Sequence, residues 1–334
     1  MGETNGDNKK KTAREIIENY NGPKVRIMEV CGTHTHEIFR LGIRKLLPEQ
    51  VELISGPGCP VCVTPVSFID EAIYLALEKG VTICTFGDLV RVPGTKMSLA
   101  GAREQGGKIH IVYSPADAEK YAKEHPKEQV TFLSVGFETT TPSACLSVKK
   151  AREEGLTNYS ILTANKTMPQ AYEALKGSAD IFLYPGHVNA ITGTKLCEEL
   201  VQEGVSGVVA GFTAKELLTA LAVALTHFQK GKPFFVNCYP RVVTEEGSKE
   251  AQRLVDTLME KTHLTVNGED SESYRDQDFV YVMNGGCMMP ERNIRFRRWK
   301  EGRIRPADAG MYYRENVNHP TVKYLERSVH RSIR

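Results

Sequence analysis

Short apolar, β-branched runs recur along the chain up to about residue 240 and alternate with segments of helical spacing. Runs this short and apolar on both faces are typical of buried strands in parallel sheets. Several of the intervening amphipathic segments, such as 67–80, 194–204 and 214–231, end in glycine, a common helix stop. The alternation predicts an α/β fold with open parallel sheets. The runs lie at residues 25–30, 51–55, 81–86, 108–113, 130–135, 160–165, 180–184, 205–210 and 233–237.

The number of strands exceeds what one small sheet would comfortably hold, so we expect two similar parallel-sheet α/β domains that face a cleft. A polar stretch at 118–129 separates the first four runs from the next five. This places domain I at 22–125 and domain II at 126–240. Residues 1–21 are expected to form a polar N-terminal helix or arm. The pattern fails after residue 240, so residues 241–334 are expected to form a C-terminal extension or third subdomain.

Composition narrows the class of protein. Hydrophobic residues make up 41% and charged residues 25%, and the net charge is only +2. This is the balance of a globular protein, with no general excess of charge for a polyanionic partner. No apolar run approaches the roughly 20 residues of a membrane span, and the N-terminal segment has no apolar signal core. We therefore expect a cytoplasmic protein with no membrane or nucleic-acid partner.

Loops rich in glycine, proline and reactive side chains follow six of the runs. In parallel α/β sheets, ligands bind beyond the carboxyl ends of the strands. The six loops therefore indicate a shared site, expected in the cleft between the two domains. They are CGTHTHE (31–37), GPGCPVC (56–62), GFETTTP (136–142), YPGHVNAITG (184–193), GFT (211–213) and CYPRVV (238–243).

The first loop combines a cysteine with histidines and hydroxyls. Cysteine in the loops of a cytoplasmic protein favours metal binding, catalysis or redox exchange over structural disulfides. Cys31 ends a predicted strand before a possible helix start, so we expect its pKa to be lowered and its thiolate to act as a soft-metal ligand or nucleophile. His34 can hold a proton beside it, flanked by Thr33 and Thr35, whereas His36 could face solvent. The alternative is a buried cysteine beside a polar turn.

The second loop contains the pair Cys59 and Cys62 in a CxxC spacing. Such a pair can form a disulfide, bind metal or exchange two electrons. A structural zinc site needs four ligands, and the chain has no second CxxC. Zinc would therefore require mixed ligands, and redox exchange is favoured over it. Two unpaired core thiols remain the alternative.

Two further loops contain candidate acid–base groups. Glu138 can hydrogen-bond a polar ligand or belong to a helix start. His187 can donate a proton or fix an anion, unless it is simply a loop histidine with its own partners. Asp88 and Lys166 are weaker candidates. Among the other cysteines, packing is expected for Cys84, Cys145 and Cys197, Cys238 is open, and no role is assigned to Cys287.

Taken together, CGTHTHE, GPGCPVCVTP, GFETTTP, YPGHVNAITG, GFT and YPRVV resemble loops of the HypD family of hydrogenase formation proteins, over about residues 24–245. The resemblance implies a [NiFe] hydrogenase maturation factor, a scaffold on which the Fe(CN)2CO centre is assembled with HypC-type and HypE-type partners. It implies that Cys31 is the iron-binding thiolate, shared with a cysteine of the HypC-type partner, and that His34 assists there. Cys59 and Cys62 would handle electrons while cyanide arrives from a thiocyanate-bearing tail of the HypE-type partner.

The resemblance also implies a [4Fe-4S] cluster on a cysteine-rich C-terminal segment. A cluster held by cysteine alone needs four thiolates. Beyond Cys238 this sequence has only Cys287, which puts the cluster in doubt for this chain. Two alternatives to the maturation scaffold therefore stay open. One is a thiol oxidoreductase that uses Cys59 and Cys62, and the other is a HypD-like binding platform that has lost the redox step.

Overall fold

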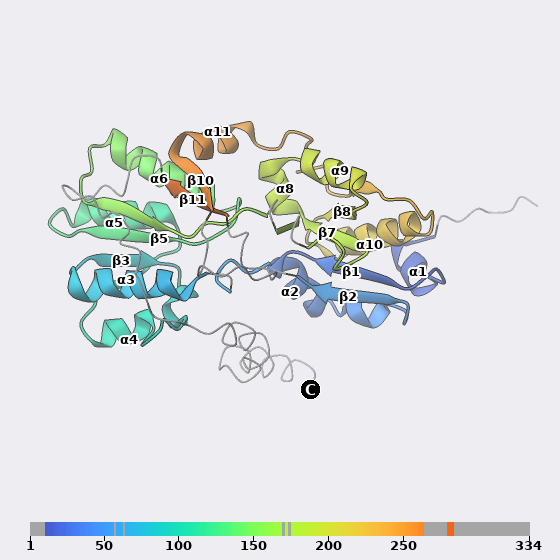
Figure 1. The fold of residues 1–334 in the computed structure, drawn as a ribbon, viewed down its shortest axis with the longest axis horizontal. Coiled ribbons are helices and arrows are strands. Elements are labelled where there is room, and N and C mark those ends of the chain that lie inside the picture. The colour runs from blue at the N-terminus through green and yellow to red at the C-terminus, as the bar shows by residue number, and fades with distance from the viewer. Residues whose placement is uncertain are drawn as a thin grey trace, which may run out of the picture. The chain divides into compact units, whose positions relative to one another are not determined.

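The computed structural model describes residues 11–263, apart from 57, 63, 169–170 and 173–174, and also residues 279–283 (Figure 1). Strands and helices alternate along this part of the chain, which confirms the predicted α/β class. The strands are β1 (Val25–Glu29), β2 (Val51–Ser55), β3 (Thr82–Thr85), β4 (Ile109–Ile111), β5 (Val130–Ser134), β6 (Tyr159–Thr163), β7 (Ile181–Pro185), β8 (Ser206–Ala210), β9 (Phe235–Asn237), β10 (Met259–His263) and β11 (Phe279–Met283).

The helices fill the intervals between the strands. The α-helices are α1 (Ala13–Glu18), α2 (Gly32–Arg40), α3 (Val66–Glu78), α4 (Leu99–Glu104), α5 (Pro115–Glu124), α6 (Thr141–Glu153), α8 (Gly186–Thr192), α9 (Lys195–Gln202), α10 (Ala214–Phe228) and α11 (Lys249–Leu258). Two short 3₁₀ helices, η1 (Ile43–Leu46) and η2 (Leu89–Arg91), follow α2 and β3. In the described ranges, no helix is long and apolar enough to cross a membrane.

The strands form two parallel sheets, as predicted. Sheet A has the strand order β2-β1-β7-β8-β9, and sheet B has the order β4-β3-β5-β6. Every neighbouring pair in both sheets is parallel. Their loops at the carboxyl ends therefore share one edge of each sheet. The remaining described strands, β10 and β11, form an antiparallel pair.

The allocation of strands to the sheets differs from the sequence-based expectation. Sheet A takes β1 and β2 from the first part of the chain and β7, β8 and β9 from the last part, while β3 to β6 form sheet B. The expectation that the first four runs belong together is therefore wrong. The bounds 22–125 and 126–240 do not coincide with the two sheets. Apolar runs mark a strand as buried on both faces, but they do not identify its neighbours.

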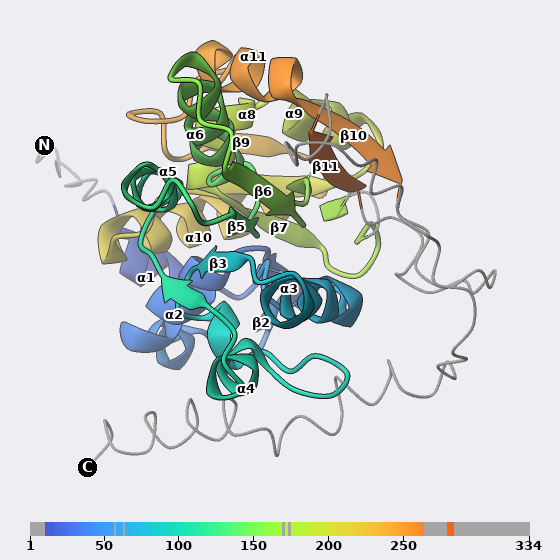
Figure 2. The same cartoon turned by 90° about the vertical axis from the view of Figure 1, so that its left-hand side faces the viewer.

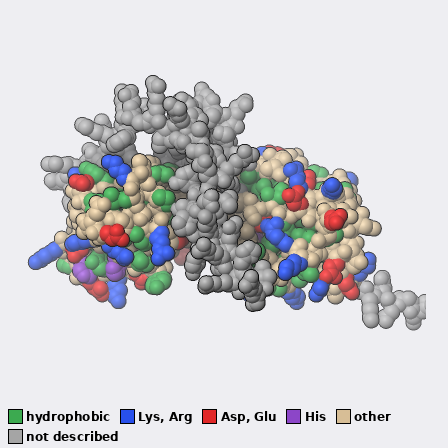
Figure 3. Space-filling view, turned by 90° about the horizontal axis from the view of Figure 1, so that it is seen from below, with side chains coloured by type: hydrophobic (Ala, Val, Ile, Leu, Met, Phe, Trp, Pro, Cys, Tyr) green, Lys and Arg blue, Asp and Glu red, His purple; other side chains and the backbone are tan. Residues whose placement is uncertain are grey.

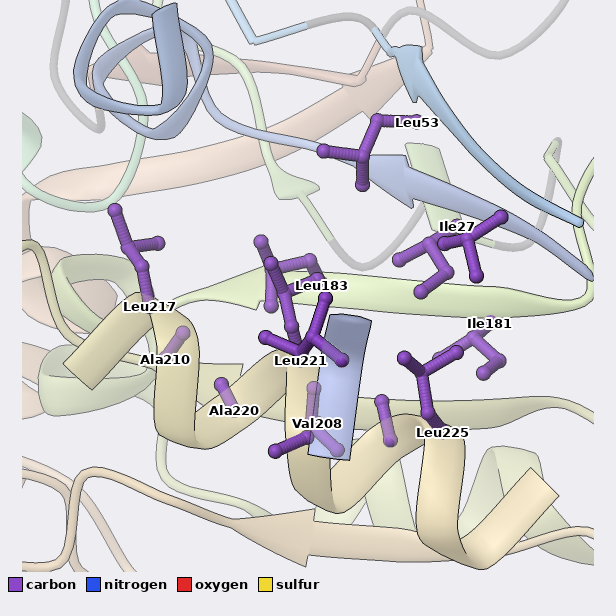
Figure 4. Close-up of a cluster of buried hydrophobic side chains, with 14 of the residues drawn as sticks. Ile27, Leu53, Ile181, Leu183, Val208, Ala210, Leu217, Ala220, Leu221 and Leu225 are labelled. Atoms are coloured by element: carbon purple, nitrogen blue, oxygen red, sulfur yellow. The ribbon is translucent and has the colours of Figure 1, made fainter. Parts of the chain in front are cut away.

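Sheet A packs one face against α10, as Figure 4 shows. Leu217, Leu221 and Leu225 recur every four residues, so they lie on one side of the helix, and all three are fully buried. Burial of a leucine side chain stabilises the fold by about 1.5–3 kcal/mol. The sheet contributes every second residue to this contact, because alternate side chains of a strand point to the same face. These residues include Ile27, Leu53, Ile181, Leu183, Val208 and Ala210.

Both sheets are covered on both faces, which explains the continuous apolar runs. On sheet B, Ile83 faces a core shared with α3 and α4, and its neighbour Cys84 faces a core shared with α5 and α6. Figure 2 shows these helix pairs on opposite sides of the sheet. On sheet A, α8 and α9 cover the face opposite α10, through residues such as Val188 and Leu200.

The two ends of the described chain are partly structured. Thr12 and Glu15 form a capping box at the start of α1, and Ile17 of that helix is buried against the α10 side of sheet A. Of the predicted C-terminal extension, α11 packs through Val255 and Leu258 into the core of sheet B.

Acidic and basic side chains intermix over the described surface seen in Figure 3, consistent with the small net charge.

Candidate functional site

The candidate loops lie at the carboxyl ends of the sheet strands. Cys31 follows β1, the CxxC loop follows β2, His187 follows β7, Phe212 follows β8 and Cys238 follows β9, so all five positions belong to sheet A. The loop 136–142 follows β5 of sheet B. Strand order determines which loops are neighbours. Because β1, β7 and β8 are consecutive in sheet A, the segments that contain Cys31, His187 and Phe212 lie side by side.

Cys31 is the N-cap residue of α2 and is partly buried. Burial raises the pKa of its thiol, because it removes water from the thiolate. The backbone N–H groups of His34 and Thr33 and the Thr33 hydroxyl lie near the sulfur and oppose that rise, although the Cys31 side chain makes no capping hydrogen bond at this helix start. The net shift is upward, so the expected lowering of the Cys31 pKa is wrong for the free thiol. The N–H groups at the helix start nonetheless favour the thiolate form of Cys31.

The Cys31 segment and the CxxC segment touch through their backbones. Gly32 N–H donates to the Gly58 carbonyl oxygen at 3.2 Å. A Cβ added at Gly58 would lie 2.4 Å from the Gly32 nitrogen and 2.6 Å from the Cys31 Cα, closer than real Cβ atoms approach. Glycine is therefore required for this contact. The contact joins the residue after Cys31 to the residue before Cys59.

Cys59 and Cys62 are free thiols that differ in their protonation. A hydrogen bond from the Cys62 side chain, opposed by burial and helped by the N–H groups of Cys62 and Val61, lowers the pKa of Cys59 to about 6. The same interaction, together with burial, raises the pKa of Cys62. The negative charge of Asp88 raises both values. Cys59 is thus a thiolate at neutral pH with a protonated, exposed neighbour, the state needed for dithiol exchange.

His34 is completely buried in the first turn of α2. Its Nε2 lies 3.0 Å from the carbonyl oxygen of Gly211. Burial lowers the pKa of His34 to about 4, against the Gly211 and Ala210 carbonyls that raise it and a charge on His187 that lowers it further. The imidazole is therefore neutral at pH 7. Since a carbonyl oxygen only accepts hydrogen bonds, Nε2 carries the ring proton, and this N–H donates a hydrogen bond to the Gly211 carbonyl oxygen.

Phe212 lies between two histidine rings. The ring centroids of His34 and Phe212 are 4.5 Å apart with planes at 29°, and those of His187 and Phe212 are 3.9 Å apart at 20°. His187 is itself exposed, although partial burial lowers its pKa. Sequence analysis noted the GFT loop but assigned no role to Phe212. Its sequence signal was an aromatic residue directly after Gly211, the glycine that follows β8.

Glu138 is buried, and its Oε1 accepts a hydrogen bond from the Met168 N–H at 2.9 Å. It therefore ties the loop after β5 to the segment after β6. The helix start at α6 is stabilised by Thr141 instead, whose hydroxyl donates to the Phe137 carbonyl oxygen at 2.9 Å. Lys166 is also buried, and its N–H donates to the Gly136 carbonyl oxygen.

Tyr172 is a second residue that sequence analysis missed. It is fully buried, and burial, followed by the charges of Cys197, Glu138, Tyr184 and Cys31, raises its pKa well above the ordinary value. Its ring packs edge-on against Tyr184, with centroids 4.9 Å apart. Tyr172 thus lies in electrostatic range of both Cys31 and Glu138.

The remaining candidates take secondary positions. The Thr35 hydroxyl donates to the Cys31 carbonyl oxygen at 3.2 Å, which stabilises the first turn of α2, while Thr33 and His36 are exposed. Cys84, Cys145 and Cys197 are buried in the apolar cores, as expected. Cys238 is partly buried, and burial raises its pKa to about 11. The position of Cys287 lies outside the described residues.

The described side chains do not form a ready-made metal site. No group of three or more His, Cys, Asp or Glu side chains is placed to hold a metal ion within the described ranges. The cysteines in these ranges therefore do not come together as the four thiolates of a [4Fe-4S] cluster.

The chain is similar in sequence to known proteins over the region that contains these loops. The family model described as "HypD: Hydrogenase formation hypA family" matches residues 7–269. Proteins named hydrogenase maturation factor HypD are similar to the chain: that of Rhodobacter capsulatus is 41% identical over 242 residues, covering 71% of this chain and 64% of the relative. That of Cupriavidus necator is 39% identical over 251 residues, which cover 72% of this chain and 66% of the relative. That of Escherichia coli is 40% identical over 253 residues, which cover 74% of this chain and 66% of the relative.

The chain thus spans just under two thirds of the length of these relatives. The family model covers well over half of the chain, including the Cys31, CxxC, Glu138, His187 and Phe212 loops. The chain therefore belongs to the HypD family of hydrogenase formation proteins.

Proposed function

We propose that this chain is a scaffold on which the Fe(CN)2CO centre of [NiFe] hydrogenases is assembled, together with HypC-type and HypE-type partners. The observation that carries the proposal is the backbone contact between Gly32 and Gly58, which joins a partly buried cysteine to a CxxC pair poised for exchange. A metal-binding thiol and a source of two electrons thereby belong to one local structure.

Cys31 is the residue assigned to iron, which is cargo rather than a resident cofactor. A thiolate is a soft ligand, and the N–H groups of Thr33 and His34 stabilise its charge. The raised pKa of the free thiol means that metal binding displaces a proton from it. Since the described residues offer no three-ligand group, the other positions on iron belong to cyanide, carbon monoxide and a cysteine of the HypC-type partner. A centre held by few protein ligands is suited to transfer.

Cys59 and Cys62 are assigned to cyanide transfer from a thiocyanate group on the HypE-type partner. Cleavage of an S–CN bond to a thiolate and cyanide requires two electrons. Oxidation of the Cys59 thiolate and the Cys62 thiol to a disulfide supplies those two electrons and releases one proton. Cyanide then joins the iron on Cys31. The low pKa of Cys59 and the exposure of Cys62 support this role.

The two alternatives differ from the scaffold in which cysteines they require. A stand-alone thiol oxidoreductase would use Cys59 and Cys62 without partners and would tolerate loss of Cys31. A binding platform without the redox step would bind its partners equally well without either CxxC thiol. The contact of Gly32 with Gly58 favours the scaffold, because neither alternative requires Cys31 beside the CxxC loop.

Iron content tests the proposal. The chain is produced without oxygen together with its HypC-type partner, and iron in the purified complex is measured by mass spectrometry. Cys31→Ala should reduce iron to the background level, because the thiolate ligand is lost. Cys238→Ala is the matched control, since Cys238 is also partly buried at a strand end of sheet A, and it should retain iron. Equal iron in Cys31→Ala and wild type would reject the assignment.

A further inference from the structure

The imidazole of His34 presents only one ring nitrogen that is free to act. Nε2 is committed to the Gly211 carbonyl oxygen at 3.0 Å. Nδ1 is buried and has no hydrogen-bond partner within the ranges that the structure describes. A buried nitrogen lone pair without a partner costs free energy, so an unpaired one calls for an explanation. Cys31 is the N-cap residue of α2 and His34 lies in the first turn of the same helix, three residues further on, which places His34 next to Cys31.

The orientation of this ring is set by the segment that follows β8. Gly211 accepts from Nε2, and Phe212, the next residue, stacks on the ring face at 4.5 Å. His187 stacks on the other face of Phe212 at 3.9 Å. A Cβ at Gly211 would meet the Glu216 carboxylate and the Tyr239 ring, so this segment packs closely against both side chains. Rotation of the His34 ring would break both the hydrogen bond and the stack.

The Phe212 segment is itself held by α10 and the loop after β9. The Glu216 carboxylate accepts from the N–H groups of Phe212 and Thr213 at 3.0 and 3.1 Å. Arg241 pairs with the same carboxylate at 2.8 Å. Phe212 packs edge-on against Tyr239, with centroids 6.4 Å apart. Phe212 is therefore held through its own backbone, by α10 and by the loop after β9, which makes its ring a rigid support for His34.

We infer that Phe212 is a positioning residue that fixes His34 in the Nε2–H form, so that Nδ1 is the atom through which His34 acts on the Cys31 site. His187 is the outer support of the stack and acts through Phe212, in place of the direct proton-donating role predicted from sequence. The inference rests on the proposed function for the importance of the Cys31 site. The ring geometry itself can be measured without iron or partners.

Nitrogen NMR of the iron-free chain with ¹⁵N-labelled histidine tests the ring geometry directly. At pH 7 the wild-type spectrum should show His34 as a neutral ring with the proton on Nε2 and an unprotonated Nδ1. Phe212→Leu should give averaged nitrogen shifts, because the stacked face is lost. Phe212→Tyr keeps the ring and should restore the wild-type shifts. His187→Phe should also preserve them, whereas His187→Ala should shift them toward averaging.

Iron retention supplies a second readout that separates the two claims. In the complex with the HypC-type partner, Phe212→Leu should retain about fivefold less iron than Phe212→Tyr, the factor that one ordinary hydrogen bond provides. If wild type retains no iron while the NMR result holds, the proposed function fails and the positioning role stands. A wild-type His34 with its proton on Nδ1, or unchanged shifts in a folded Phe212→Leu variant, would overturn the inference.

Discussion

At the scale of single residues, burial and hydrogen bonding set the protonation states of Cys31, Cys59 and His34. Burial raises the pKa of Cys31, whereas a neighbouring thiol lowers that of Cys59 to about 6. Burial also keeps His34 neutral, with a pKa of about 4. The site thus combines a protonated thiol at Cys31, a thiolate at Cys59 and an uncharged imidazole at His34. Sequence analysis identified all three residues, but their protonation depends on burial and hydrogen bonds that no sequence pattern specifies.

The alkylation of Cys59 tests its pKa. Because only the thiolate reacts, the rate of iodoacetamide attack at Cys59 should rise to half its plateau near pH 6, where the thiol titrates. Cys62→Ala removes the side-chain hydrogen bond and should move the half-maximum to higher pH. The reaction at pH 6 should slow about fivefold for the first unit of pKa gained and about tenfold for each further unit. Peptide mass spectrometry measures the rate at Cys59 alone.

Cys62→Ser serves as the matched control for that series. The serine hydroxyl still donates toward the Cys59 sulfur, so the half-maximum should stay below that of Cys62→Ala. A wild-type half-maximum near pH 9, the ordinary range of a free thiol, would contradict the account of Cys59.

At the scale of elements, the site depends on strand order and on glycine. The consecutive strands β1, β7 and β8 deliver His34, His187 and Phe212 to one stack, although these residues are far apart in sequence. Sequence analysis placed the loops correctly at strand ends and expected them to share a site. It could not foresee the stack, because an apolar strand sequence does not show which strands lie beside it. The chain passes from sheet A to sheet B after β2 and returns to sheet A after β6.

Gly58→Ala tests the contact between the two cysteine segments. The added Cβ would overlap the backbone of Cys31 and Gly32, neither of which can rotate away, so one loop must shift. We expect the free energy of unfolding to fall by about 1–3 kcal/mol, as in other overpacked sites. Cys31 should also be alkylated faster, because its burial depends on the contact. Urea unfolding and peptide mass spectrometry measure the two effects.

Gly87→Ala is the control for this substitution. Gly87 lies in an exposed loop, and its added Cβ would meet only the Ile111 side chain at an ordinary 3.6 Å. The control should leave both stability and Cys31 reactivity close to wild type. If Gly58→Ala behaves like Gly87→Ala, the two segments are not held together as the structure describes.

At the scale of the whole molecule, the fold class was predictable and the division of the chain was not. Short buried runs such as 130–135 and 205–210 gave the strands of two parallel sheets, because parallel strands are covered on both faces. The break at 118–129 looked like a domain boundary, yet its helix α5 packs within the core of sheet B. The family comparison spans both sheets, so the maturation role is proposed for the combined structure of the described residues.

Infrared spectroscopy of the oxygen-free complex with the HypC-type partner tests the central claim most directly. Cyanide and carbon monoxide bound to iron absorb in a region where protein does not, so the spectrum reports the assembled centre itself. The account predicts cyanide and carbonyl bands in wild type and in Cys238→Ala, and their loss in Cys31→Ala. Wild-type bands that persist unchanged in a folded Cys31→Ala variant, or a wild-type complex that has iron but no such bands, would contradict it.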